Sequence, residues 1–200
     1  MKRIALFASG AGTNVQNLLR RASSFSAIEI SCVIVDNETS PLPERLKFGY
    51  PQLPVYRILP DARIEKAERK KDLEKRIISL LDLHGVEWVL LAGYMRIIGT
   101  TLLNRFPRRI VNIHPSLLPD YPGLSAYERA FEDQVTESGV TIHLVDEGMD
   151  TGPVVLQRKF YRSSADTLES FIRRGKDVEW ELYPEILKIL NESATLLPGE

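Results

Sequence analysis

The 200-residue sequence contains very little cysteine and no long apolar run. Its one cysteine, Cys32, cannot form a disulfide within the chain, and its place in the apolar run Ile30 to Val35 predicts a buried, inert thiol. No stretch approaches the roughly 20 consecutive apolar residues that a membrane span needs. Only a short apolar run follows Met1-Lys2-Arg3. We therefore expect a cytoplasmic protein that does not interact with membranes.

The sequence also lacks an excess of positive charge. It has 26 Lys and Arg residues against 27 Asp and Glu residues, which gives a formal net charge of −1 at pH 7. A surface that binds nucleic acid neutralises many phosphates and needs clustered Lys and Arg in excess. The charged run Glu65 to Arg76 has mixed signs, which is typical of a solvated helix face. We expect small-molecule partners and no nucleic acid.

The order of apolar runs and helical patterns predicts an α/β fold with a Rossmann-like, mostly parallel central sheet and helices on both faces. Two later runs alternate in polarity and predict an antiparallel hairpin towards the C-terminus. The length suits one domain over residues 1–200. The chain is predicted to end in two helices, Thr167 to Arg174 and Val178 to Asn191. The predicted strands are Arg3 to Ala8, Ile28 to Val35, Leu53 to Tyr56, Trp88 to Gly93, Ile110 to Ile113, Gly139 to Val145 and Pro153 to Tyr161.

A loop rich in small residues, Ser9 to Asn14, joins the first predicted strand to a helix. Exposed backbone N–H groups and the positive end of a helix dipole suit an anion, usually phosphate. Asp36 follows the second strand, where a ribose-binding acid of a dinucleotide site would lie, but Val15 occupies the place of that motif's third glycine. The loop therefore favours a lone phosphate over NAD. A tight turn that binds no ligand is the alternative.

Asn112 and His114 lie two residues apart at the end of a predicted strand, so their side chains should point to the same side. Pro115 favours extended backbone at His114 and stops the strand from continuing. Ligands of open α/β sheets bind at the carboxyl ends of the strands. An amide and an imidazole at this edge are suited to polarising a carbonyl and moving a proton. In the alternative interpretation, His114 caps a turn and Asn112 binds backbone.

Two further stretches could line a binding site. Tyr94 to Ile98 follows the Trp88 strand and offers apolar side chains with one cation, which would suit a flat aromatic ligand bearing carboxylates. Core packing of this stretch is the alternative. Asp146 to Pro153 predicts a compact, carboxylate-rich loop whose acids could instead be turn formers. We expect no metal, because His114, His143 and scattered carboxylates do not make the usual zinc ligand set.

Taken together, several of these stretches resemble the phosphoribosylglycinamide formyltransferases, which are folate-dependent formyltransferases. The most specific feature is Asn-x-His-Pro-Ser-Leu-Leu-Pro followed, some thirty residues later, by Asp-x-Gly, and the resemblance covers nearly the whole chain. It implies metal-free transfer of a formyl group from 10-formyltetrahydrofolate to the amine of 5′-phosphoribosylglycinamide in de novo purine biosynthesis. The stretches that carry it are Ser9 to Asn14, Leu91 to Ile98, Asn112 to Pro119 and Asp146 to Pro153.

The resemblance also implies roles for individual residues. Residues 1–110 would form the phosphate- and nucleotide-binding half, and residues 111–200 the catalytic and folate-binding half, of a monomer or homodimer. The implied catalytic residues are Asn112, His114 and Asp150, and those that bind the ribonucleotide are Gly12, Thr13, Asn14 and Glu179. The implied folate-binding residues are Lys70, Met95, Arg96, Ile97, Ile98, Asn112, Asp146, Glu147, Gly148, Met149 and Asp150.

The chemistry explains the residue types of the implied catalytic group. An amine that attacks a formyl carbon builds negative charge on the formyl oxygen, and removing one hydrogen-bond donor to such an oxygen typically costs roughly 3 to 4 kcal/mol. Asn112 and a protonated His114 would be the donors, and a nearby Asp150 is predicted to raise the pKa of His114. There are two alternative hypotheses. In one, the protein uses the same folate but transfers the formyl group to a different acceptor or to water; in the other, it is a non-catalytic nucleotide-binding module.

The sequence departs from the family pattern in a few places. Lys70 stands where relatives often have an arginine that helps to hold the folate, and Ser125-Ala126-Tyr127 stands where histidine is common. The neighbours of Glu179, Val178 and Trp180, are also unusual. These departures bear on which substrate is used more than on the type of reaction.

Overall fold

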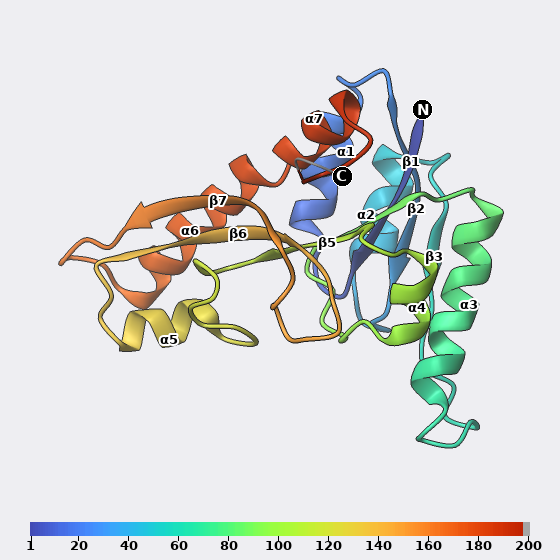
Figure 1. Ribbon diagram of the computed structural model, residues 1–200, viewed down its shortest axis with the longest axis horizontal. Coiled ribbons are helices and arrows are strands. Elements are labelled where there is room, and N and C mark those ends of the chain that lie inside the picture. Colours follow the sequence, from blue (N-terminus) through green and yellow to red (C-terminus); the bar gives the residue numbers. More distant parts are fainter. Residues whose placement is uncertain (198–200) are drawn as a thin grey trace.

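The structure is a computed structural model that describes residues 1–197 and is built on one seven-stranded sheet with the strand order β3-β2-β1-β4-β5-β6-β7 (Figure 1). Strands β1 to β5 pair in parallel, whereas β5–β6 and β6–β7 pair antiparallel. The predicted α/β fold with a mostly parallel sheet and an antiparallel hairpin is confirmed. The strands are β1 (Lys2–Ala8), β2 (Ile28–Val35), β3 (Val55–Arg57), β4 (Trp88–Leu91), β5 (Ile110–His114), β6 (Glu137–Leu144) and β7 (Val154–Tyr161).

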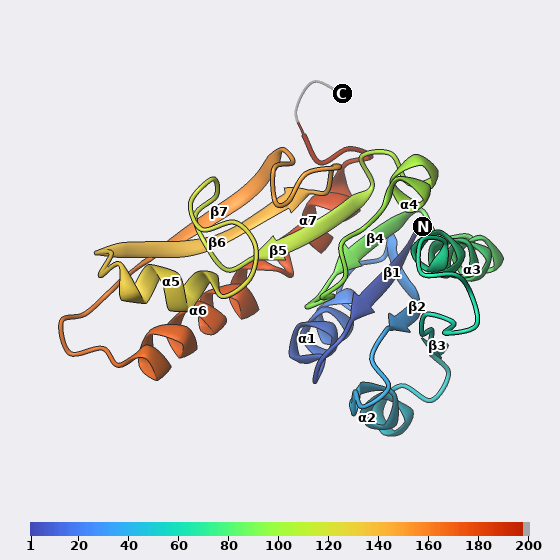
Figure 2. The same ribbon diagram turned by 90° about the horizontal axis from the view of Figure 1, so that it is seen from below.

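Helices cover both faces of the parallel part because its strands are apolar on both sides. On β1, Ile4 and Leu6 belong to a core cluster that includes residues of α1, α2 and α7, while Ala5 and Phe7 belong to a second cluster that includes residues of α3 and α4. Figure 2 shows α1 and α2 on one side of β1 and α3 and α4 on the other. The helices are α1 (Thr13–Ala22), α2 (Leu42–Gly49), α3 (Arg69–Leu83), α4 (Thr100–Arg105), α5 (Ala126–Glu132), α6 (Leu168–Leu182) and α7 (Glu185–Glu192). None of the described helices is long and apolar enough to cross a membrane.

The strand order creates a switch point between β1 and β4. The chain moves outward from β1 to β2 and β3, then returns to place β4 on the other side of β1. In open α/β sheets, ligands bind outside the carboxyl ends of the strands at such a switch point. The loops that leave β1, β4 and β5 therefore meet at one edge, where Gly12 follows β1, Met95 to Ile98 follow β4, and Asn112 and His114 lie at the end of β5.

The break between the last two helices was predicted in the wrong place. Instead of ending near Arg174, α6 runs through Gly175 to Leu182, and α7 starts after Pro184. Proline lacks the N–H that would continue a helix, so Pro184 separates the two. Glycine weakens a helix by only about 1 kcal/mol, which tertiary packing can offset.

Candidate active site

The three side chains proposed for catalysis lie together at the end of β5. Asn112 and His114 lie on β5 itself, and Asp150 comes from the loop between β6 and β7. One carboxylate oxygen of Asp150, Oδ1, lies 3.4 Å from Nδ2 of Asn112, and the other, Oδ2, lies 3.2 Å from Nδ1 of His114. Asp150 has a φ of 56°, a left-handed conformation that Asp tolerates better than most residues. An amide, an imidazole and a carboxylate thus share one small polar site.

His143 belongs to the same cluster, although the sequence analysis named it only in arguing that the chain lacks the usual zinc ligand set. It lies opposite Asn112 in the antiparallel register of β5 and β6. Its Nδ1 donates to the carbonyl of Leu144 at 2.9 Å, while its Nε2 lies 3.2 Å from Nδ2 of Asn112 and 3.5 Å from Oδ1 of Asp150. Polarity alternation predicted the strand, but only the register brings His143 beside Asn112.

Burial and hydrogen bonding act in opposite directions on the carboxyl group of Asp150. Burial raises its pKa, but hydrogen bonds with His143 and with the backbone N–H of Gly123, at 2.8 Å from Oδ2, outweigh this effect. The positive charge of a protonated His114 acts in the same direction as the hydrogen bonds. The resulting pKa of Asp150 is about 2, so the group is ionised at neutral pH.

The prediction of a raised pKa for His114 is wrong in this structure. Burial is the largest influence and lowers the pKa of this histidine, which is only 4% exposed. The carbonyl of Tyr121, 2.9 Å from Nε2, and the charge of Asp150 both oppose that effect without overcoming it. The direction expected from Asp150 alone was right, but the depth of burial could not be read from the sequence.

The backbone after β5 is unusually rich in left-handed residues. Tyr121, Gly123 and Ser125 have φ values of 53°, 80° and 55°. This segment supplies the Tyr121 carbonyl to His114 and the Gly123 N–H to Asp150. Both ring nitrogens of His114 consequently face protein acceptors.

The loop after β1 has the features of an anion site. Gly12, with φ of 72°, precedes α1, and a Cβ atom there would lie 2.3 Å from Cδ1 of Leu42, so only glycine fits. Thr13 is exposed, and among the described residues no side chain caps this helix end. Asn14 donates through Nδ2 to Oε2 of Glu179 at 3.1 Å. The structure thus brings the predicted ribonucleotide residues Gly12, Thr13, Asn14 and Glu179 close together.

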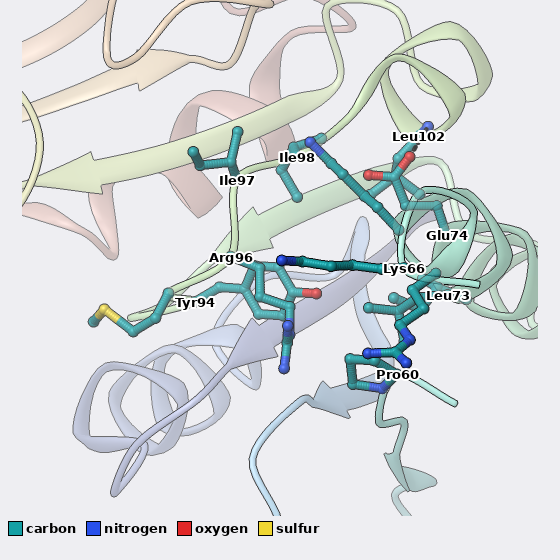
Figure 3. Close-up of a pocket in the computed structure, with 13 residues that line it drawn as sticks. Pro60, Lys66, Leu73, Glu74, Tyr94, Arg96, Ile97, Ile98 and Leu102 are labelled. Carbon is teal, nitrogen blue, oxygen red and sulfur yellow. Dashed lines mark hydrogen bonds between the residues drawn. The ribbon is translucent and has the colours of Figure 1, made fainter. Parts of the chain in front are cut away.

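A cavity of about 590 Å³ lies between α3 and the segment that follows β4. Figure 3 shows Leu73 and Glu74 of α3 facing Tyr94 and Ile98 across it. Both interpretations of this segment hold in part. Met95 and Ile97 are 67% and 63% exposed, as a pocket wall allows, whereas Ile98 is 6% exposed and packs in the core. The predicted folate residues that line the cavity are Lys70, Met95, Arg96, Ile97 and Ile98.

Arg96 forms an ion pair with a buried acid. Its Nε lies 2.7 Å from Oδ2 of Asp36, a residue that is 5% exposed. Ser9 donates through Oγ to the other oxygen of Asp36 at 2.5 Å and accepts from the backbone N–H of Met95 at 2.8 Å. Asp36, considered above as a ribose-binding acid of an NAD site, thus joins the ends of β1, β2 and β4.

The remaining predicted folate residues lie in the loop between β6 and β7. Asp146 accepts hydrogen bonds through Oδ1 from the Gly148 N–H at 3.0 Å and from Oγ1 of Thr151 at 2.7 Å, as the turn-forming alternative predicts. Glu147 and Lys70 both line a neighbouring cavity of about 420 Å³. Met149 is 57% exposed. Asn112 and Asp150 do not line the larger cavity.

Within residues 1–197, no group of three or more His, Cys, Asp or Glu side chains could hold a metal ion. The amide, imidazole and carboxylate groups already described can donate hydrogen bonds to a polarised oxygen and can transfer protons.

Comparisons with known proteins find formyltransferases at the levels of family, sequence and structure. A family model described as "Formyl transferase" matches residues 2–187. Phosphoribosylglycinamide formyltransferase of Bacillus subtilis (strain 168) is 39% identical over 191 residues, which cover 95% of each chain. The crystal structure of phosphoribosylglycinamide formyltransferase from Bacillus halodurans is 40% identical and superposes with a TM-score of 0.86 over 100% of both chains. A trifunctional purine biosynthetic protein, adenosine-3, of Drosophila pseudoobscura pseudoobscura is 32% identical over 198 residues, 96% of this chain and 14% of that protein.

Proposed function

The chain belongs to the formyl transferase family, and on this premise we propose that it transfers a formyl group from 10-formyltetrahydrofolate to the amine of 5′-phosphoribosylglycinamide in de novo purine biosynthesis. The observation that carries the proposal is the meeting of Asn112, His114 and Asp150 at the end of β5. This site lies at the same sheet edge as the anion-binding loop and the cavity beside α3. Two substrates bound at those places would present an amine and a formyl group to the polar cluster between them.

The reaction forms a bond between the substrate nitrogen and the formyl carbon and breaks the bond from that carbon to N10 of the folate. In the tetrahedral intermediate the formyl oxygen carries negative charge, which Asn112 and His114 would stabilise by donating hydrogen bonds. The ionised carboxylate of Asp150 would accept the proton that the attacking amine loses and would pass it, through water, to N10 as N10 leaves. His114 has acceptors at both ring nitrogens, so its contact with the Tyr121 carbonyl must open before Nε2 can donate to substrate.

The other predicted residues follow from the same proposal. Gly12, Thr13, Asn14 and Glu179 would bind the ribonucleotide, and the cavity lined by Lys70 and residues 95–98 would bind the folate, with residues 146–150 beside it. Residues 1–110 would then be the nucleotide-binding half and residues 111–200 the catalytic and folate-binding half of one domain. We propose that the protein acts in the cytoplasm as a monomer or homodimer.

Turnover measured with and without the ribonucleotide tests the proposal. The purified protein should consume 10-formyltetrahydrofolate only when 5′-phosphoribosylglycinamide is present, and His114→Ala or Asp150→Ala should abolish turnover without unfolding the protein. His84→Ala, a histidine variant at the end of α3, is the control and should keep full activity. Consumption without the amine would indicate a hydrolase, binding without turnover a non-catalytic module, and full activity of either variant would contradict the mechanism.

A further inference from the structure

Tyr127 is a buried aromatic residue whose hydroxyl reaches a functional carboxylate. It lies on α5, is 5% exposed, and packs its ring against Phe160 and Phe171, each with 6.3 Å between ring centroids. Its hydroxyl donates to Oε1 of Glu179 at 2.8 Å. The ring is therefore fixed in an apolar cluster, and its polar end contacts the acid proposed to bind the ribonucleotide.

The sequence of α6 accommodates this ring. Gly175 precedes Glu179 by one helical turn, so the two residues share one face of α6. A Cβ atom at Gly175 would lie 2.4 Å from Cε1 and Cζ of Tyr127 and 2.5 Å from its hydroxyl oxygen. Any other residue would displace the ring. The close approach explains why a helix-weakening glycine occupies the middle of a long helix.

The second oxygen of Glu179 is held from another direction. Oε2 accepts the hydrogen bond from Asn14, which lies in the first turn of α1 directly after Gly12 and Thr13. A carboxylate oxygen can accept more than one hydrogen bond, so Glu179 retains acceptor capacity when both protein donors are in place. Asn14 donates to Glu179, and the backbone N–H groups of the helix end and the exposed Thr13 lie beside it as donors for a phosphate.

We propose that Tyr127 is a positioning residue that sets the affinity for the ribonucleotide by holding the Glu179 carboxylate where it accepts hydrogen bonds from the ribose hydroxyls. This inference rests on the proposed function. A ribose whose 5′-phosphate occupies the start of α1 has its hydroxyl groups within one sugar length of that helix end. In dinucleotide-binding sites, too, an acidic side chain binds ribose, because its carboxylate accepts hydrogen bonds from the ribose hydroxyls.

Tyr127→Phe removes the hydroxyl and keeps the packing of the ring. We expect the KM for the ribonucleotide to rise about tenfold, the size expected for losing one hydrogen bond to a charged group. The value of kcat and the KM for 10-formyltetrahydrofolate should change less than about twofold, since Tyr127 acts only through a residue on the ribonucleotide side. Tyr161→Phe, at a tyrosine that is 67% exposed on β7, is the matched control and should behave like the wild type.

Two measurements separate positioning from a merely structural role. Burial raises the pKa of Glu179 and the hydrogen bonds from Tyr127 and Asn14 oppose this, so Tyr127→Phe should move the acid limb of ribonucleotide binding to higher pH. In a Glu179→Gln background, Tyr127→Phe should have no further effect on that KM. An undiminished effect in that background, or a fall in kcat with the ribonucleotide KM unchanged, would overturn the proposal.

A readout without turnover distinguishes this inference from the proposed function. The pKa of Glu179 can be followed by carbon NMR of the unliganded protein and assigned with Glu179→Gln, while calorimetry measures binding of ribose 5-phosphate. Tyr127→Phe should raise that pKa and weaken that binding. If the wild type transfers no formyl group, the proposed function fails, and these two measurements still decide the role of Tyr127. An unchanged pKa and unchanged binding would refute it.

Discussion

Replacing Asp150 by Asn gives the sharpest test of how the site is held together. The variant keeps the size of the side chain and removes the charge that contacts the Gly123 N–H at 2.8 Å, Nδ1 of His114 at 3.2 Å and Nε2 of His143 at 3.5 Å. The side chain of Asp150 is only 14% exposed, so solvent screens these contacts weakly. The same contacts that lower its pKa therefore stabilise the folded state.

The magnitude follows from the pKa of Asp150, which falls from its ordinary value of 3.8 to about 2. Since one pK unit corresponds to ~1.4 kcal/mol, ionised Asp150 stabilises the folded protein by ~2 kcal/mol at neutral pH. The folded-state pKa lies below the unfolded-state value, so this stabilisation is fully present above about pH 4 and is lost as the pH falls towards 2.

Urea unfolding followed by circular dichroism at pH 7, 5, 4 and 3 measures the effect. At pH 7, Asp150→Asn should lower the free energy of unfolding by ~2 kcal/mol, and the difference from the wild type should be clearly smaller at pH 3. Because the wild type loses stability in acid at many other groups, only this difference reports on Asp150. Equal stability of the two proteins at pH 7, or a difference that does not change with pH, would refute the reasoning.

Three other substitutions test separate parts of the structure. Asn112→Ala should lower kcat by about 10²- to 10³-fold, as expected for one oxyanion donor, and steady-state kinetics should show little change in the KM for the folate. Gly12→Ala forces a Cβ against Leu42 at a left-handed φ of 72°, so calorimetry should show a ribonucleotide affinity at least tenfold weaker. Glu74→Gln removes a buried carboxylate that accepts from the Gly99 N–H at 2.5 Å, and urea unfolding should show a loss of about 1 to 3 kcal/mol.

The parallel part of the fold could be predicted because its strands carry their own signal. Apolar runs such as Ile28–Val35 have no polar face and need helices on both sides, which is the arrangement that the structure has. The predicted helix break fell beside Gly175, whereas the two helices separate at Pro184. Only the contact with Tyr127 reveals why that glycine lies inside a helix.

The site was predicted less completely than the fold. Asn112 and His114 could be paired from their spacing on one strand, and Asp150 was added through the family resemblance. His143 depends on an antiparallel register, and Tyr127 depends on helix packing; neither leaves a local pattern in the sequence. The direction of the pKa shift of His114 was predicted wrongly because the resemblance supplied a charged neighbour and gave no measure of burial.

The hydrogen bond between Asn14 and Glu179 joins residues that are 165 positions apart in the chain. During synthesis on the ribosome, the first partner emerges almost at once, and the second is added only when most of the polypeptide has been made. A nascent or half-folded chain consequently lacks the complete site that we propose for the ribose. The amount of nucleotide bound at saturation would therefore measure the number of completely folded molecules. Nucleotide binding would also stabilise the whole domain against unfolding rather than one part of it.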